Sequence, residues 1–285
     1  DIKSNTESTL LLLDFCLHND CEKFIYASSM SVYGLHNKEN VKETLKCDPK
    51  SFYAVGKLAS ENYMKIYSSS GIQTTALRLF NTYGPGQNMS NMKQGMISIY
   101  LAQFLKNKEI LVKGSGERYR DFIYIDDVIE CFVKSLTLEK DVPKVINVGT
   151  GKKTLVNDLL NMIEIKLETG KNISFKNGTP GDLFGITANI ELMDKFFGKT
   201  KKTSLEDGLD KMINFYNDKP ISIDLPNQVK FKVTSTDVAL KGQTVSSSYK
   251  PAILNNGLNV QVPPFIESGD EIIVDTRNLE YIKKI

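Results

Sequence analysis

The chain has 285 residues, enough for two domains or one large α/β domain with an appendage, and its 36 Lys and Arg residues nearly balance 34 Asp and Glu residues. This balance excludes a strong overall basic field of the kind that attracts nucleic acid or an anionic membrane. Four cysteines without a Cys-x-x-Cys pair, in a sequence with no secretory segment, favour reduced thiols in a cytoplasmic protein and disfavour a metal site.

The first segment predicts a helix that packs inside the protein. The run LLLLDFCL at 10–17 is too short to span a bilayer and contains Asp14, so we expect a buried helix and no membrane role. The sequence opens with Asp1 and is helical in pattern within a few residues. It therefore reads as beginning inside a domain.

Residues 1–216 alternate strand and helix patterns, which is typical of βαβ units with a parallel sheet. Pro49 near the start and Gly71 at the end delimit one of the expected helices. The expected strands are KFIYAS (23–28), IQTTALRLFN (72–81), the start of RDFIYIDDVIECFVKSL (120–136) and the start of KVINVGTG (144–151). The expected helices include 49–71, QGMISIYLAQFLKN (94–107) and the second part of 120–136.

From about residue 217 onward the helical periodicity disappears. Short β-type runs follow, divided by Gly, Pro and Asn: ISIDL (221–225), VKFKVTST (229–236), QTVSSS (243–248), LNVQVP (258–263) and DEIIVDT (270–276). Such spacing is typical of a small barrel or sandwich. The pattern therefore predicts two domains, 1–216 and 217–285.

Tyr53 and Lys57 stand four residues apart at the expected start of a helix, so their side chains share one face. A phenol that acts as a base near neutral pH needs a lowered pKa. A cation about 5 Å away contributes roughly 3 kcal/mol at an effective dielectric constant near 20. Alone, this short spacing also fits a chance pair of one aromatic and one charged residue on a helix.

A loop rich in hydroxyl groups follows the strand KFIYAS. Ser28, Ser29 and Ser31 stand at the carboxyl end of that strand, where open α/β sheets bind ligands. The alternative for any single serine is an ordinary turn residue.

Six segments in order carry a family resemblance: FIYASSMSVYG, SFYAVGKLASE, ALRLFNTYGPGQ, GSGERYRDFIYIDDV, INVGTG and PGDLFGITANIELMDKFFG. Together they resemble the extended short-chain dehydrogenase/reductase family, and within it the NAD-dependent sugar-nucleotide epimerases and dehydratases. The resemblance covers about residues 1–216. It implies a partial Rossmann-like parallel sheet with a substrate-binding part, and a nucleotide sugar as the substrate.

The resemblance also implies roles for individual residues. Tyr53 would take a proton from a sugar hydroxyl while the carbon beneath it gives a hydride to NAD, and Lys57 would assist Tyr53 and hold the nicotinamide ribose. The implied catalytic residues are Ser29, Tyr53 and Lys57; the substrate-binding residues are Ser28, Asn81 and Arg120; the cofactor-binding residues are Tyr53, Lys57 and Phe80.

Two of these assignments have alternatives, and one further residue, Asn5, matches the family in part. Ser28 is the second choice for the role given to Ser29. Arg120 could instead form a surface ion pair with Asp121 or Asp126. Asn5 matches an Asn of the family that helps to order the active site, but with Ser8 where the family has glycine.

A dinucleotide-binding fold needs a Gly-x-Gly-x-x-Gly turn after its first strand, because the pyrophosphate lies on the following helix N-terminus. The glycine pairs at 84/86, 114/116 and 149/151 lack that pattern. Judged by the family, about four initial strands are missing. We therefore expect no tight NAD binding unless another chain supplies that half.

The second segment resembles the C-terminal domain of elongation factor P, through KPAILNNGLNVQVPPFIESG (250–269) and GDEIIVDTRNLEYIKK (269–284). The resemblance implies a small all-β barrel of the oligonucleotide-binding (OB) type that contacts the ribosome or tRNA. The bases that could meet phosphates are Lys230, Lys232, Lys241, Lys250 and Arg277. Solvated surface charges are the alternative, since this segment has as many acids as bases.

Three functional interpretations follow. The leading one is an NAD-dependent epimerase or dehydratase of a nucleotide-activated sugar, impaired by the loss of the dinucleotide-binding half. The second is a translation module that works through the barrel. The third is a fusion without a function as one protein. A homodimer is left open.

Overall fold

The computed structural model describes residues 2–35, 38–92, 95–106, 109–139, 142–170, 172–178, 183–199, 201–216, 219–220, 228–237 and 249–285. The chain divides into two compact units, Asp1–Ile221 and Ser222–Ile285. The division falls a few residues after the position that the change of sequence pattern suggests. In the part of the chain that is described, no helix is long and apolar enough to cross a membrane.

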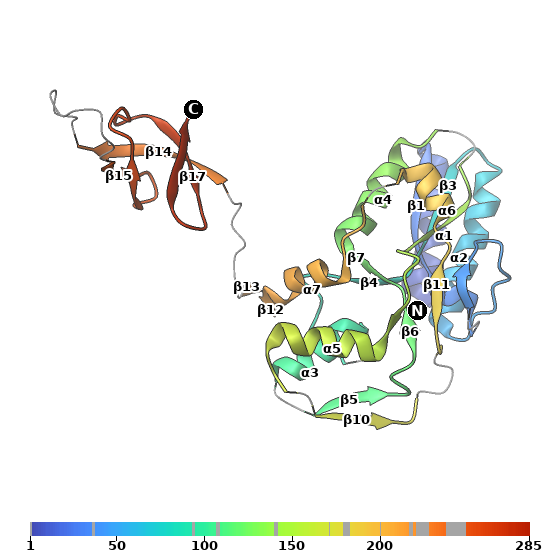
Figure 1. Ribbon diagram of the computed structural model, residues 1–285. Helices are drawn as coiled ribbons and strands as arrows, with labels where there is room; N and C mark the ends of the chain where they lie inside the picture. The colour runs from blue at the N-terminus through green and yellow to red at the C-terminus, as the bar shows by residue number, and fades with distance from the viewer. Residues whose placement is uncertain are drawn as a thin grey trace. The chain divides into compact units, whose positions relative to one another are not determined.

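The first unit alternates strands and helices along the chain (Figure 1). Its helical segments are η1 (Ile2–Glu7), α1 (Ser8–His18), η2 (Met30–Tyr33), α2 (Phe52–Ser68), α3 (Met96–Leu105), α4 (Ile125–Thr137), α5 (Val156–Leu167), α6 (Glu191–Phe197) and α7 (Leu205–Ile213). Its strands are β1 (Lys23–Ser29), β2 (Lys38–Val41), β3 (Gln73–Leu79), β4 (Asn81–Tyr83), β5 (Ile110–Lys113), β6 (Tyr119–Arg120), β7 (Phe122–Tyr124), β8 (Val145–Val148), β9 (Thr154–Leu155), β10 (Ile173–Lys176), β11 (Ile186–Ala188), β12 (Phe215–Tyr216) and β13 (Lys219–Pro220).

A parallel sheet in the order β1-β3-β8 positions the candidate site. Successive side chains of a strand point to opposite faces. Ala76 of β3 packs with Leu13 of α1 and Met64 of α2, whereas the next residue, Leu77, packs with Val128 of α4. Helices therefore cover both faces of β3, which explains why the neighbouring residues Ala76 and Leu77 are both apolar. The predicted parallel sheet with helices is confirmed.

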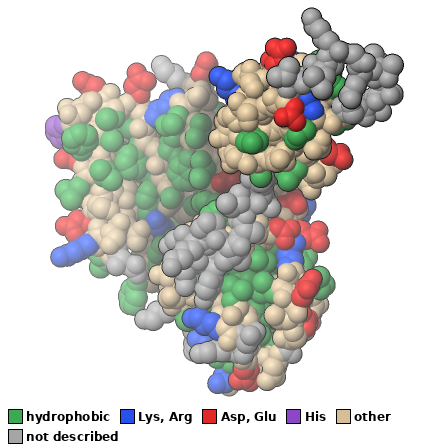
Figure 2. Space-filling model, turned by 90° about the vertical axis from the view of Figure 1, so that its left-hand side faces the viewer, with side chains coloured by type: hydrophobic (Ala, Val, Ile, Leu, Met, Phe, Trp, Pro, Cys, Tyr) green, Lys and Arg blue, Asp and Glu red, His purple; other side chains and the backbone are tan. Residues whose placement is uncertain are grey.

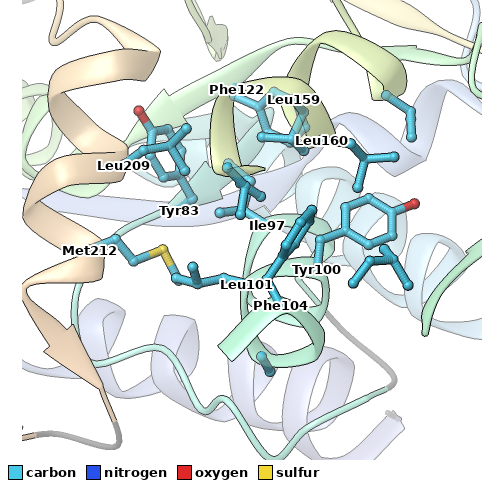
Figure 3. Close-up of a cluster of buried hydrophobic side chains, with 14 of the residues drawn as sticks. Tyr83, Ile97, Tyr100, Leu101, Phe104, Phe122, Leu159, Leu160, Leu209 and Met212 are labelled. Atoms are coloured by element: carbon cyan, nitrogen blue, oxygen red, sulfur yellow. The ribbon is translucent and has the colours of Figure 1, made fainter. Parts of the chain in front are cut away.

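A second apolar cluster lies between α3, α5 and α7 and the strands β5 and β7 (Figure 3). Leu101 and Phe104 of α3 meet Leu159 and Leu160 of α5, and Leu209 of α7 closes the cluster. All five side chains are buried. This packing fixes the start of α3 next to β4, which becomes one wall of the candidate site.

The helix predicted at 10–17 forms, but the prediction that it is buried is wrong. In α1 only Thr9 and Leu13 are buried, while Leu11 and Phe15 are 64% and 59% exposed. The reason is that the apolar residues run consecutively and so point all around the helix, while one face alone meets α2 and the sheet. Figure 2 shows that apolar side chains cover part of the molecular surface in that view.

The second unit is an antiparallel sheet in the order β16-β15-β14-β17-β18. The strands are β14 (Gln228–Thr236), β15 (Lys250–Leu254), β16 (Asn259–Val262), β17 (Glu271–Asp275) and β18 (Glu280–Lys284). Alternate residues such as Val260 and Val262 are buried in its core. The expected small all-β unit is confirmed. The predicted runs 221–225 and 243–248 lie outside the described residues.

Candidate active site

A cavity of about 230 Å³ lies at the carboxyl ends of β1 and β3. Ser29, the last residue of β1, is paired with Leu79, the last residue of β3, and both line the cavity. Phe80 and Asn81 follow directly, and the start of α3 forms another part of the wall. Three of the sequence-predicted site residues, Ser29, Phe80 and Asn81, thus come together at the end of the sheet where α/β proteins bind ligands.

Local hydrogen bonds fix the hydroxyl oxygen of Ser29 at this wall. It accepts the backbone N–H of Ser31 at 3.2 Å and the hydroxyl of Ser31 at 2.9 Å. Ser29 has an extended backbone and acts as the N-cap of η2, which is the geometry that serine favours at such a position. The oxygen is therefore held in place before any ligand arrives.

Tyr53 and Lys57 lie on α2, whose start is set by Ser51. The Ser51 side chain accepts the backbone N–H of Ala54 at 3.1 Å, so the helix begins at Phe52 and not at Pro49. The Lys57 Nζ lies 5.5 Å from the centre of the Tyr53 ring, and Tyr53 is 38% exposed. The predicted pair thus shares one helix face, and neither residue is among those that line the cavity.

The ammonium of Lys57 is also attached to the sheet. It donates to the carbonyl oxygen of Ala27 in β1 at 2.9 Å and lies 4.8 Å from the centre of the Tyr26 ring. Burial lowers the pKa of Lys57. Because Ala27 precedes Ser29 by two residues, this bond links the Tyr53–Lys57 pair to the strand that carries Ser29.

Between β3 and α2 lies a buried ion pair that the sequence reasoning missed. Arg78 of β3 donates from Nε to Glu61 Oε1 at 3.0 Å and from Nη2 to Glu61 Oε2 at 2.7 Å, and both side chains are almost fully buried. Burial alone lowers the pKa of Arg78, but its bonds to Glu61 and the nearby Tyr33 raise it overall. Glu61 follows Lys57 by four residues on α2. This i+4 spacing is the feature of the sequence that places Glu61 on the same helix face as Lys57.

Ser28 belongs to this buried pair. Its hydroxyl donates to Glu61 Oε1 at 2.5 Å, and the residue is 2% exposed. Ser28 is paired with Arg78 in the strand register, so its side chain points into the protein at that level of the sheet. Of the two serines, Ser29 and not Ser28 lines the cavity.

Two side-chain amides of the cavity wall carry buried oxygens without a hydrogen-bond partner in the described part of the structure. They are Asn81 Oδ1 and Gln87 Oε1. A buried polar atom without a partner is costly, so each is an observation in favour of a ligand. Gln87 was missed from the sequence. The feature of the sequence that could have indicated Gln87 is its position at the end of the ALRLFNTYGPGQ segment, in the loop that follows β4.

Arg120 lies on β6 and is 5% exposed. Its Nη1 donates to the carbonyl oxygens of Tyr119 and Phe184 at 2.8 and 3.1 Å. The neighbouring Asp121 is fully buried, and it accepts the backbone N–H groups of Thr150, Gly151 and Ala188. Burial raises the pKa of Asp121, and these bonds oppose that change. Asp121 thus orients the glycine turn after β8.

Asn5 lies in η1 and connects this segment to α2. Its carbonyl oxygen accepts the hydroxyls of Ser60 and Thr9, both at 2.6 Å. These contacts hold η1 against the helix that carries Tyr53 and Lys57. The role of Asn5 in ordering the site remains a prediction.

The basic residues of the second unit are mostly engaged with their own sheet. Lys230 pairs with Glu271, and Arg277 pairs with Asp275 at 2.6 Å. Lys250 donates to the carbonyl oxygen of Asp237 at 2.7 Å. Lys241 lies outside the described residues.

Comparison with known proteins agrees with this geometry. The sequence profile of the NAD dependent epimerase/dehydratase family matches residues 1–149, and that of the elongation factor P C-terminal domain matches residues 229–284. A protein of Methanocaldococcus jannaschii named "Putative UDP-glucose 4-epimerase" is 30% identical over 213 residues, which are 74% of this chain and 68% of that protein. Both parts of the sequence resemblance are confirmed.

Two further comparisons concern a solved structure and the second unit. The UDP-glucuronic acid 4-epimerase of Bacillus cereus, solved with UDP-glucuronic acid and NAD, has a TM-score of 0.70 and 30% identity, covering 75% of this chain and 67% of its own. Elongation factor P of Pelagibacter ubique is 67% identical over 85 residues, which are 30% of this chain and 46% of that protein. The chain thus spans about half the length of this elongation factor P.

Proposed function

The chain belongs to the NAD dependent epimerase/dehydratase family, and from this premise we propose that its first unit binds a nucleotide-activated sugar and epimerises or dehydrates it with NAD. The observation that carries the proposal is the cavity at the ends of β1 and β3, with Ser29 and the unpartnered Asn81 Oδ1 in its wall. Ligands of open α/β sheets bind at this end of the strands.

Each residue has a chemical role in this proposal. Ser29 holds the reacting sugar hydroxyl by a hydrogen bond, and Tyr53 removes its proton as a general base. The Lys57 ammonium lies 5.5 Å from the centre of the Tyr53 ring, within electrostatic reach of the negative charge that develops on the oxygen as the proton is transferred. NAD, when bound, supplies the hydride acceptor and donor.

The diphosphate of the substrate is assigned to the start of α3. Gly95 caps this helix without a side-chain hydrogen bond, and Gly95, Met96 and Ile97 line the cavity beside Asn81. Backbone N–H groups at a helix N-terminus attract phosphate oxygens, and Asn81 adds its Nδ2 group as a donor, which leaves its Oδ1 to accept a hydrogen bond from a hydroxyl of the sugar. Arg120 remains a proposed second contact for the diphosphate, by analogy with the family alone.

For the cofactor, the residues present suit one end of NAD. Tyr53 and Lys57 would hold the nicotinamide ribose, and Phe80, which lines the cavity, is the third residue that the family implies for the cofactor. The sequence contains no Gly-x-Gly-x-x-Gly turn to receive the pyrophosphate. We therefore propose that this chain alone holds NAD weakly.

Turnover of a UDP-sugar by the full chain with excess NAD tests the proposal. Product formation is followed by proton NMR for the wild type, for Tyr53→Phe and for the control Tyr67→Phe, which lies on the last turn of the same helix. Tyr53→Phe should abolish turnover, whereas Tyr67→Phe should retain it. Turnover that survives Tyr53→Phe would show that the assigned base is wrong.

A second function is supported by the 67% identity of residues near the C-terminus to an elongation factor P. We propose that the second unit contacts the ribosome or tRNA. Lys230 and Arg277 already pair with carboxylates of their own sheet, so affinity for phosphate should be modest and salt-sensitive. Binding of tRNA measured with and without residues 217–285 tests this function; equal binding by both proteins would exclude it.

A further inference from the structure

The C-terminal end of α1 brings two cysteines, Cys16 and Cys21, together. The helix ends at His18, and Asp20 has φ +52°, the left-handed conformation that a Schellman motif places just beyond a helix cap. The backbone N–H of Cys21 donates to the carbonyl oxygen of Cys16 at 3.0 Å, which is the hydrogen bond that defines this motif. The side chains at the two ends of that bond commonly touch in a Schellman motif, and here both are thiols.

The two thiols lie within hydrogen-bonding reach of each other. Burial raises the pKa of the Cys16 thiol, and a hydrogen bond with Cys21 raises it further. Both residues are half-buried, so a small solute has access to their sulfur atoms. A disulfide needs Cα atoms about 4.4–6.8 Å apart, and the hydrogen bond between the two backbones holds them close together. The pair is therefore arranged for an intrachain bond.

The other two cysteines have different surroundings. Cys131 is 2% exposed and packs in the apolar cluster that contains Leu77. Cys47 packs against a separate apolar cluster that contains Val32. Neither belongs to the motif at the end of α1, so both serve as reference thiols within the same chain.

We propose that Cys16 and Cys21 are a reversible oxidation site, at which a small disulfide such as oxidised glutathione closes an intrachain bond. One cysteine thiolate attacks a sulfur of the glutathione disulfide, breaks its S–S bond and releases one glutathione thiolate. The other cysteine thiolate attacks the protein sulfur of the mixed disulfide and releases the second glutathione. The protein thus loses two protons and two electrons, and the glutathione disulfide is reduced to two thiols. The new bond ties the last turn of α1 to the residues that lead into β1.

Thiol–disulfide equilibration of the full chain in mixtures of reduced and oxidised glutathione tests this site. After the remaining thiols are alkylated, trypsin releases residues 4–23 as one peptide that contains both cysteines. In the wild type this peptide should become lighter by two hydrogens and carry no alkyl group. The equilibrium constant for closing the bond should be at least about tenfold higher in the native chain than in urea, because the folded motif holds the thiols together. An equal constant in the two states, or glutathione adducts in place of the internal bond, would overturn the inference.

Substitutions of Asp20, which is exposed, test whether the motif is responsible. Asp20→Gly keeps the left-handed conformation and should leave the equilibrium constant within about twofold of the wild type. Asp20→Val disfavours that conformation and should lower the constant about threefold or more. Cys47→Ser is the matched control and should change nothing, whereas Cys21→Ser should let Cys16 form only a glutathione adduct. Equal constants in Asp20→Gly and Asp20→Val, or a lower constant in Cys47→Ser, would contradict the assignment of the site to this motif.

Discussion

Replacement of Glu61 by alanine should destabilise the first unit strongly. Glu61 is 0% and Arg78 is 4% exposed, and the variant leaves the guanidinium buried without its counterion. It also removes two bonds from Arg78 and the acceptor of Ser28. Loss of one partner of a buried pair costs about 3–5 kcal/mol. Tm of a unit of this size should fall by roughly 6–20 °C.

Urea unfolding followed by circular dichroism at the helical wavelength measures this change, since the helices lie within residues 2–213. Glu191→Ala is the matched control, because Glu191 pairs with Lys42 but is 71% exposed. That exposed pair is worth about 1 kcal/mol or less. The double variant Glu61→Leu with Arg78→Leu should recover much of the loss, because no buried charge remains unpaired. Equal effects of Glu61→Ala and Glu191→Ala would refute the reasoning.

Three further predictions concern packing, pH and the cofactor. Gly149→Ala places a Cβ 2.8 Å from Asp121 Oδ2 and should cost about 1–3 kcal/mol in thermal unfolding, whereas Gly170→Ala, with open space around it, should cost little. Burial raises the pKa of Tyr33 to about 12, so its contribution to stability is complete below its ordinary value near pH 10 and is lost as pH rises toward 12. The advantage of the wild type over Tyr33→Phe in urea unfolding should therefore shrink by roughly 2–3 kcal/mol across that range; a constant advantage would contradict it. Fluorescence titration with NADH should not saturate below about 1 mM, and tighter binding would show that the chain holds the cofactor without a glycine-rich turn.

Elements could be predicted from the sequence where the periodicity of their apolar residues matches the side chains that are buried in the structure. The strand at 23–28 and the helix that carries Tyr53 follow from such patterns, and the structure has β1 and α2 there. The exact start of α2 depends on the hydrogen bond of Ser51, which a helix-start pattern around Pro49 does not reveal. The burial of 10–17 depends on what packs against each helix face, and periodicity alone carries no such information.

In the candidate site, too, some residues could be predicted from local sequence patterns and others could not. The motifs predict Ser29, Asn81, Tyr53 and Lys57 as site residues, because these residues stand at strand ends or at a helical spacing. The Arg78–Glu61 pair joins a strand to a helix 17 residues away, and the orphan oxygen of Gln87 depends on the space left by Gly95. Such contacts arise from the packing of segments that are distant in the sequence, so the spacing of neighbouring residues does not predict them.

The proposal that the cavity at the ends of β1 and β3 holds a nucleotide sugar is tested most directly by calorimetric titration of UDP-glucose into Asn81→Leu. We expect the wild type to bind UDP-glucose and Asn81→Leu to lose about tenfold or more in affinity, because a contact to a charged diphosphate is removed. Asn62→Leu, at an exposed position of α2, should bind like the wild type. Unchanged affinity in Asn81→Leu would contradict the account.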